Sequence, residues 1–566
     1  EDNCSEKRLD DINAKIISSK VCGTGKSTYI FNQKDKNSKL IYLPIGGEMT
    51  KDDLIKRIEA AIPYTSNNNK TKYILHIDLT KTKNIDLVKD FLFKLLFLKK
   101  FELDENIIYI RPNDLIYIEL ENSFNSLLNT YKILNLLPEA NILLPDIKIT
   151  RELKIVSTIL YYYEKNEIQK RNFNFEKDVI KNEIESRQII LKYLNIKNPN
   201  LYQINTFVNV LCSEFVKFNS CLGFSPSVLK ENAQAVGMTP EKAVDLRKSI
   251  IGYLIKITKH FTEGPYEKLI KNQKINQELY SNENKQKYIN ENLSINIDSS
   301  SFDKIKPSMI FFNEDERSCT IITTCNEKDK EFKNLEKVYY LQSTDFKNGK
   351  SNLYKKLRNF REFNSNEIFD YLLSFLNVSG LDEKRKKEIL GSYVYTPDNF
   401  IKVILIRMRL RVKIPVILMG ETGCGKTTLI EMASKLINKG KIYLKKMNIH
   451  AGIVDKDIIK FIEKVKSQIK HEDDKMYKKK IKEFNDMPEK SRQAYLKNNT
   501  EKQIFQGYMD EIKKREIWVF FDELNTCNSM GLLTEILCKN SIYGKPLDKR
   551  FIFIASCNPY RILEKR

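Results

Sequence analysis

The sequence has few of the residues that build a zinc cluster or a disulfide-stabilised secreted fold. It contains four histidines and ten cysteines in 566 residues, and no two cysteines form a C-x-x-C pair. Structural zinc sites need closely spaced thiolate or imidazole ligands, so we expect no zinc cluster and a reducing compartment. Long apolar runs are also missing, because the run nearest to membrane length, Phe91 to Phe101, is short and contains Lys94. We therefore expect no transmembrane segment.

Clustered positive charge is missing too, although the chain is basic. Lys and Arg total 96 against 74 for Asp and Glu, which gives a formal net charge of +22. The lysines are dispersed, and neither a short arginine-rich tract nor a base-stacking aromatic motif accompanies them. We interpret the charge as a solvated lysine-rich surface and expect no specific nucleic acid as a partner.

The ends of the sequence lack an initiator Met, a signal peptide and a complete last domain. The chain starts at Glu1 and stops at Arg566, shortly after the last predicted strand. We expect a piece of a longer protein that divides into several domains, since one core rarely serves so long a chain.

The strongest motif that is present lies between Ile414 and Ile430, where an apolar strand leads into GETGCGKT and then a helix. The glycines of G-x-x-x-x-G-K-[ST] let backbone N–H groups point at phosphate, and the helix N-terminus adds its dipole. Lys426 is predicted to contact the β- and γ-phosphates of ATP and Thr427 to contact Mg²⁺. The predicted ATP-binding residues are Gly420, Glu421, Thr422, Gly423, Cys424, Gly425, Lys426, Thr427 and Thr428.

Two later strands supply polar side chains to this loop. The apolar run Ile517 to Phe521 ends in Asp522 and Glu523, and the run Phe551 to Cys557 ends at Asn558. Continuous apolar runs are typical of parallel strands buried on both faces, and open α/β sheets bind ligands at the carboxyl ends of such strands. Glu523 is predicted to polarise the attacking water. The predicted catalytic residues are Glu523, Asn558 and Lys426, and the predicted metal ligands are Thr427 and Asp522.

A weaker copy of the loop occurs near the N-terminus. The strand Lys15 to Ser19 leads into KVCGTGKST, in which Lys20 replaces the first glycine of the pattern. The end of the pattern is intact, so nucleotide binding is still expected. The predicted ATP-binding residues are Gly23, Thr24, Gly25, Lys26, Ser27 and Thr28, and the predicted metal ligands are Ser27 and Asp78.

The first site differs from the second in the residue after its acidic position. Asp78 follows an apolar strand, but Leu79 comes next where the second site has a glutamate. Without a carboxylate to orient water, we expect the first site to bind ATP and not to hydrolyse it. If it did hydrolyse ATP, another carboxylate would have to serve as the base, for example Glu119 or Glu121 on the neighbouring strand.

These motifs predict an α/β fold with two P-loop cores, each a parallel sheet between helices, and helical lid and linker regions. The second core is expected to be truncated, and a charged helical insertion interrupts it. The predicted domains are a nucleotide-binding core at 1–123, a helical lid and spacer at 124–290, a linker with a short β pair at 291–375, and a second core at 376–566 with its insertion at 471–515.

With these motifs in view, the chain resembles the mysterin family of giant AAA+ proteins that carry a RING-type ubiquitin ligase region. The segments that carry the resemblance are YTPDNFIK from Tyr395, the loop strand from Ile414, FFDELNT from Phe520, the stretch Gly531 to Leu547, and SCNPYR from Ser556. The similarity is specific between about 395 and 561 and weaker before it. Lys20 and the absence of a ligase region are departures from the family.

The resemblance implies a dynein-like ring of six AAA+ modules in one polypeptide, of which this chain would hold the second module and the start of the third. It also implies ATP and Mg²⁺ as cofactors, neighbouring AAA+ modules as partners, and a cytoplasmic, lipid-droplet-associated protein. Ubiquitin and a ubiquitin-conjugating enzyme would bind regions outside this chain. The sequence leaves open a dynein- or midasin-like motor without a ligase role, and a helicase, whose DNA affinity would fall steeply with salt.

Overall fold

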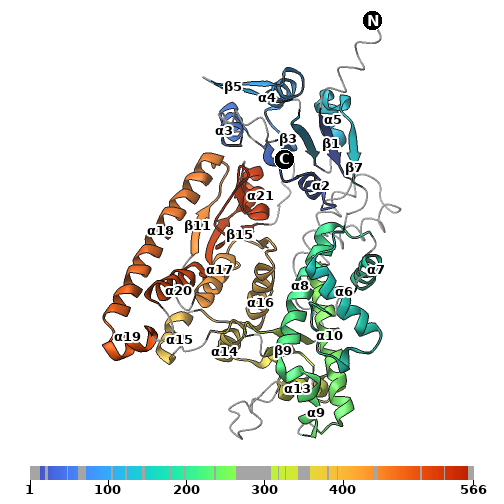
Figure 1. Ribbon diagram of the computed structural model, residues 1–566, viewed down its shortest axis with the longest axis vertical. Coiled ribbons are helices and arrows are strands. Elements are labelled where there is room, and N and C mark those ends of the chain that lie inside the picture. Colours follow the sequence, from blue (N-terminus) through green and yellow to red (C-terminus); the bar gives the residue numbers. More distant parts are fainter. Residues whose placement is uncertain are drawn as a thin grey trace. The chain divides into compact units, whose positions relative to one another are not determined.

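The computed structural model describes residues 13–558, with gaps at 20–22, 48, 62–71, 104–105, 112, 122–123, 143–146, 178–179, 181, 197, 235–236, 263–307, 316–317, 326, 342–356, 379–381, 392, 439–443, 497–499 and 528. The chain forms two compact units (Figure 1). Unit 1 comprises residues 1–143, 415–434 and 441–559, and unit 2 comprises residues 144–414, 435–440 and 560–566. Both nucleotide-binding cores predicted from the sequence fall largely in unit 1.

The first core is a parallel sheet with the strand order β2-β3-β6-β1-β7. Its central strands are continuous apolar runs because helices cover both faces, and its core includes Ile16, Leu43, Ile77 and Ile118. The strands are β1 (Ala14–Ser18), β2 (Ser38–Gly47), β3 (Lys72–Thr82), β6 (Leu115–Leu120) and β7 (Glu139–Asn141), with a separate hairpin of β4 (Lys100–Leu103) and β5 (Asn106–Tyr109). The helical segments are α2 (Lys26–Asn32), α3 (Lys51–Ala61), α4 (Ile85–Phe93), η1 (Lys94–Leu98), α5 (Phe124–Thr130) and η2 (Lys132–Leu136).

The second core repeats this arrangement with a parallel sheet in the order β10-β15-β12-β11. Its strands are β10 (Val416–Met419), β11 (Leu444–Asn448), β12 (Ile517–Asp522) and β15 (Phe551–Cys557), with a hairpin of β13 (Ser541–Ile542) and β14 (Lys545–Pro546). Its helical segments are α17 (Lys426–Ile437), α18 (Asp455–Asn485), α19 (Glu489–Leu496), α20 (Glu501–Lys513), η8 (Leu524–Thr526) and α21 (Met530–Lys539). In both cores one strand separates the phosphate-loop strand from the acidic strand.

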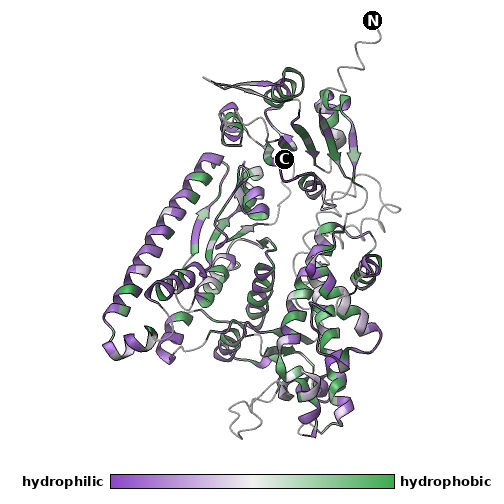
Figure 2. Ribbon diagram, in the orientation of Figure 1, coloured by the Kyte–Doolittle hydropathy of each residue, from purple (hydrophilic) through white to green (hydrophobic). Residues whose placement is uncertain are grey.

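Two element boundaries differ from the sequence prediction. Strand β7 pairs with β1, so the first sheet takes in a segment beyond residue 123, and its three residues were too short to show a strand pattern. The charged insertion begins inside α18, whose first half is part of the core through Ile458, Ile462 and Val465. Figure 2 shows the second half of α18 as mostly hydrophilic. The apolar spacing of the first half and the charged pattern of the second half belong to one helix.

Unit 2 is mainly helical and surrounds a buried hairpin. Strands β8 (Ser308–Phe312) and β9 (Cys319–Thr323) pair in antiparallel fashion, and every residue of both strands is buried. The helical segments are α6 (Arg151–Glu164), η3 (Ile168–Lys170), α7 (Glu183–Leu194), α8 (Leu201–Ser220), η4 (Leu222–Phe224), α9 (Pro226–Glu231), α10 (Pro240–Thr262), α13 (Lys330–Leu341), η7 (Phe360–Glu362), α14 (Ser365–Phe375), α15 (Glu383–Leu390) and α16 (Pro397–Arg411). Helix α16 has Thr396 as its N-cap and Pro397 in its first turn. None of the helices among the described residues is long and apolar enough to cross a membrane.

A buried ion pair joins the two cores inside unit 1. The guanidinium of Arg57, on α3 of the first core, donates to Asp455 at the start of α18, with 2.8 Å between Nε and Oδ2. The hydroxyl of Tyr543, in the turn between β13 and β14, donates to the same carboxylate over 3.0 Å. Both charged side chains are about 4% exposed, so loss of either partner would leave a buried charge unpaired.

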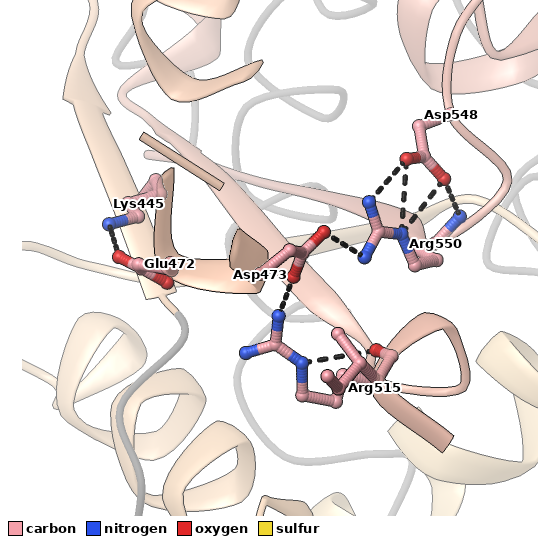
Figure 3. A network of polar contacts seen from close by, with 7 residues as sticks. Lys445, Glu472, Asp473, Arg515, Asp548 and Arg550 are labelled. Atoms are coloured by element: carbon pink, nitrogen blue, oxygen red, sulfur yellow. Dashed lines mark hydrogen bonds and ion pairs between the residues drawn. The ribbon is translucent and has the colours of Figure 1, made fainter. Parts of the chain in front are cut away.

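A second charge network holds the base of the helical insertion (Figure 3). Asp473 of α18 accepts hydrogen bonds from Arg515, and its Oδ2 lies 2.8 Å from Nη1 of Arg550. Arg550 also pairs with Asp548, and Lys445 of β11 pairs with Glu472 over 3.4 Å. Asp473 therefore ties α18 to the segments that enter β12 and β15.

We predict that Asp473→Asn lowers the free energy of unfolding by about 1–3 kcal/mol, because two arginines lose their shared carboxylate. The matched control is Asp474→Asn, since Asp474 is exposed on the same helix. Urea denaturation followed by circular dichroism would measure both. Equal stability of the two variants would contradict the role assigned to Asp473.

Candidate phosphate-binding sites

The loop between β10 and α17 has the backbone that a phosphate cradle needs. Gly423 and Gly425 adopt φ values of 84° and 81°, in the left-handed region that favours glycine. A Cβ on Gly420 would lie 2.8 Å from Sγ of Cys424, so a larger residue there would displace this exposed side chain. The ammonium of Lys426 donates to the carbonyl oxygens of Gly420 and Glu421 over 2.7 and 2.8 Å. The loop thus concentrates amide groups and a cation at the N-terminus of α17.

The polar ends of the neighbouring strands meet this loop. The hydroxyl of Thr427 donates to Asp522 over 3.0 Å, and Lys426 donates to the side-chain oxygen of Asn558 over 3.1 Å. Ser556 also donates to Asp522, and Lys446 of β11 forms an ion pair with it at 3.0 Å. Burial alone would raise the pKa of Asp522, but the hydrogen bonds from Ser556, Lys446 and Thr427 hold that pKa below its ordinary value.

The donor set fits Mg²⁺ with a triphosphate. The Asp522 carboxylate beside the Thr427 hydroxyl supplies oxygen ligands of the kind that Mg²⁺ prefers. The ammonium of Lys446 forms an ion pair with Asp522, which shows that a positive charge can lie against this carboxylate. Asp522 and Thr427 would hold the metal, and Lys426 with the loop amides would hold phosphate oxygens.

Glu523 leaves the sheet directly after the acidic strand. Strand β12 ends at Asp522, and Glu523 takes the left-handed conformation with φ 63° and ψ 42°. The residue is exposed, and its N–H approaches the hydroxyl of Ser556 at 3.4 Å. A non-glycine residue in this region of φ and ψ costs free energy, so the end of the acidic strand is locally strained.

The first site brings together a different set of side chains. Ser27 at the start of α2 donates to Glu119 over 2.7 Å, and His76 lies 2.8 Å from the same carboxylate. Lys26 reaches Glu119 at 3.7 Å and also donates to the carbonyl of Leu120. Burial would raise the pKa of Glu119, but His76, Ser27 and Lys26 together lower it. Glu119 is therefore the carboxylate that contacts the residues at the start of α2.

Asp78 lies opposite Glu119 on the adjacent strand and has other contacts. It accepts a hydrogen bond of 2.6 Å from the hydroxyl of Tyr42 on β2. Burial and the nearby charge of Glu119 raise the pKa of Asp78 above its ordinary value. Strand β3 continues past it to Thr82, and Leu79 is completely buried. The backbone here makes no turn like that at Glu523.

The structure brings most of the predicted residues of the second site together. Lys426, Thr427, Asp522 and Asn558 are in contact, and Glu523 follows the acidic strand. Their catalytic and binding roles stay predictions, as do those of Glu421, Thr422, Thr428, Gly23, Thr24, Gly25 and Thr28, which lie in or directly after the two loops.

Sequence reasoning missed several side chains that complete the sites. Lys446, Ser556, His76 and Tyr42 all contact the acidic residues. Ser27 contacts Glu119, which was not among the predicted metal ligands. Asp78 remains a predicted metal ligand, with Glu119 as a second candidate. A signal was available for His76, because a histidine inside an apolar strand needs a buried polar partner.

Comparison with known proteins identifies the second core. A phosphate loop, an acidic strand and a polar residue on the intervening strand define a P-loop module of the AAA+ class, and residues 393–561 match the family model described as the RNF213 AAA domain. The E3 ubiquitin-protein ligase rnf213-beta of Danio rerio is 33% identical over 183 residues, which is 32% of this chain and 3% of the relative. The E3 ubiquitin-protein ligase RNF213 of Homo sapiens is 33% identical over 174 residues, 30% of this chain and 3% of the relative. Residues 393–561 are therefore similar to this family, the mysterin family, over the same stretch on which the sequence resemblance rests.

The similarity covers only a small part of the relatives, because the matched segment is 3% of their length. Among solved structures, a closed state of Hsp104 with ATPγS and FITC casein aligns with 98% of this chain and 71% of that chain, at 11% identity and a TM-score of 0.17. A likeness at that level supports no conclusion about fold or function. The α/β fold of the two cores follows from their own sheets and helices.

The lowered pKa of Asp522 predicts a pH-dependent contribution to stability. A carboxylate whose folded-state pKa lies below its unfolded value stabilises the fold fully above the unfolded value and loses that contribution as pH falls through the folded value. Asp522→Asn should therefore be less stable than the parent near neutral pH, and the difference should shrink as pH falls below about 4. Urea denaturation at several pH values would test this. A difference that stays constant across this pH range would contradict the prediction.

Proposed function

We propose that this chain is the nucleotide-driven part of an AAA+ motor in which the second core hydrolyses ATP and the first core holds it. The observation that carries the proposal is the contrast after the two acidic residues. Glu523 follows the acidic strand in a left-handed turn and is exposed, whereas Leu79 continues its strand and is buried. Of the two described acidic strands, only the second has a further carboxylate directly after its acidic residue, where it could polarise water.

In the second core each contact supports one role. Lys426 and the loop amides would bind phosphate oxygens, and Asn558, already within 3.1 Å of Lys426, would orient the γ-phosphate or the water. Glu523 would accept the proton of the attacking water. Mg²⁺ beside Thr427 and Asp522 would supply positive charge to balance the phosphates.

In the first core the same elements favour retention of the nucleotide. Lys26 and Ser27 begin α2 as Lys426 and Thr427 begin α17, and Glu119 lies where Ser27 can share a metal with it. Glu119 is itself bound by His76, Ser27 and Lys26, so we do not assign it as a base. A nucleotide held here would stabilise the first core by mass action.

For the full-length protein, the names of the relatives support ubiquitin ligase activity outside these residues. We propose neighbouring AAA+ modules as direct partners, and ubiquitin with a conjugating enzyme as partners of the ligase region. A cytoplasmic location with lipid-droplet association belongs to the same family-based proposal. A dynein- or midasin-like motor without a ligase role is the alternative.

We predict that Glu523→Gln keeps ATP binding and lowers turnover by about 10² or more, the scale expected for loss of a positioned base. ATP hydrolysis by the full-length protein and binding of a fluorescent ATP analogue would be measured together. The matched control is Glu431→Gln, an exposed position on α17. Turnover equal to that of the parent would sink the assignment of Glu523.

The nucleotide content of the purified protein tests the division between the sites. After incubation with Mg²⁺, we expect intact ATP at the first site and ADP at the second, identified by chromatography of the released nucleotide. Lys26→Ala should remove the intact ATP, and Lys426→Ala should remove the ADP, because each change deletes the cation of one loop. If ATP at the first site is consumed as fast as at the second, Glu119 or Glu121 acts as a base and the first site is not silent.

A further inference from the structure

The two sites differ at one position of the strand beside the acidic residue. In the second core Lys446 pairs in register with Phe520, two residues before Asp522. In the first core Tyr42 pairs with His76, two residues before Asp78. Tyr42 therefore occupies the position of Lys446, and each side chain contacts the acidic residue of its own site, at 2.6 Å for Tyr42 and 3.0 Å for Lys446.

The exchange of lysine for tyrosine removes a positive charge from a site that has more negative charge. Asp78 faces Glu119 in the first core, whereas Asp522 receives a hydrogen bond from the neutral Ser556 in the second. Two adjacent carboxylates repel each other and would repel a triphosphate. Lys26 and His76 contact Glu119 and not Asp78, so a further cation near Asp78 would favour triphosphate binding.

The second core supplies that cation. Its helix α21 packs against β2 of the first core, and a Cβ on Gly531 would lie 3.1 Å from Cβ of Pro44. At the end of the same helix, the ammonium of Lys539 lies 3.1 Å from the centre of the Tyr42 ring. The ion pair of Arg57 with Asp455 fixes this arrangement of the two cores.

The surroundings of Lys539 connect it to the first site. The side chain of Lys539 is partly exposed to solvent. Desolvation of its ammonium lowers the pKa of Lys539, whereas the negative charges of Asp78, Glu119 and Glu535 act to raise that pKa. A cation over an aromatic face is attracted to the ring and draws electron density from it, which makes the hydroxyl of Tyr42 a stronger donor to Asp78.

We propose that Lys539 of the second core is the counter-ion of the Asp78–Glu119 carboxylate pair, acting across Tyr42, and that it makes triphosphate binding at the first site less dependent on a divalent cation. The proposal rests on nucleotide binding by the first core. Lys539 is the last residue of α21, the helix that follows Glu523, so this helix of the second core would contribute a charged residue to the first site.

The test compares nucleotide affinity with and without metal. In the full chain carrying Lys426→Ala, which disables the second site, the dissociation constant of a fluorescent ATP analogue is measured in Mg²⁺ and in EDTA. With Lys539 present, we expect the ratio of the two constants to stay small. Lys539→Met should raise the ratio by about three- to tenfold, the scale of one unit charge acting at a few ångströms in a partly solvated setting.

Three further variants make the result specific. Lys545→Met removes an exposed lysine from the adjacent hairpin and should leave the ratio unchanged, whereas Lys539→Arg should keep it low. Tyr42→Phe retains the ring without its hydroxyl and should raise the ratio in the same direction as Lys539→Met. An unchanged ratio in Lys539→Met overturns the proposal. Absence of binding in both Mg²⁺ and EDTA before Lys539 is changed refutes nucleotide binding by the first core, and the counter-ion role falls with it.

Discussion

The arrangement of unit 1 depends on one buried ion pair, between Arg57 of the first core and Asp455 of the second. A buried charge pair is weak evidence for stability, because desolvation offsets most of the Coulomb attraction. Its value here is geometric. Arg57 also donates to the carbonyl of Pro44, and Tyr543 donates to Asp455, so the pair fixes α3, β2, α18 and the β13–β14 hairpin at a single junction.

The two cores show how the same sheet can carry two electrostatic designs. The second site has Asp522 at the end of the acidic strand, Lys446 on the adjacent strand, and Glu523 in a left-handed turn after the strand. The first site has two facing carboxylates, a histidine and a tyrosine in the matching positions. The register of the strands relates the two sites. Tyr42 and Lys446 occupy the same position beside the acidic strand, and each contacts the acidic residue of its own site although one is a tyrosine and the other a lysine.

The α/β fold, the loop of the second core and its acidic strand could be predicted from the sequence because their signals are local. Continuous apolar runs that end in charged residues locate buried parallel strands, and glycine spacing locates the loop. The network around Glu119 depends on which strands become neighbours and in what register, and a single sequence does not contain that information in local form. Lys539 was beyond prediction for the same reason, since its contact joins residues from separate cores. The short strand β7 escaped because three residues are too few to show a period of two.

Helix α18 has a mechanical consequence. Its 31 residues form one continuous helix whose first half is packed into the second core and which Asp473, past its midpoint, ties to Arg515 and Arg550. The part of the helix beyond Asp473 is about 18 Å long at a rise of 1.5 Å per residue, so a rotation of about 5° at Asp473 would move the far end by about 1.6 Å. The segments that enter β12 and β15 are thereby connected to the far end of α18 through Asp473 and one uninterrupted helix.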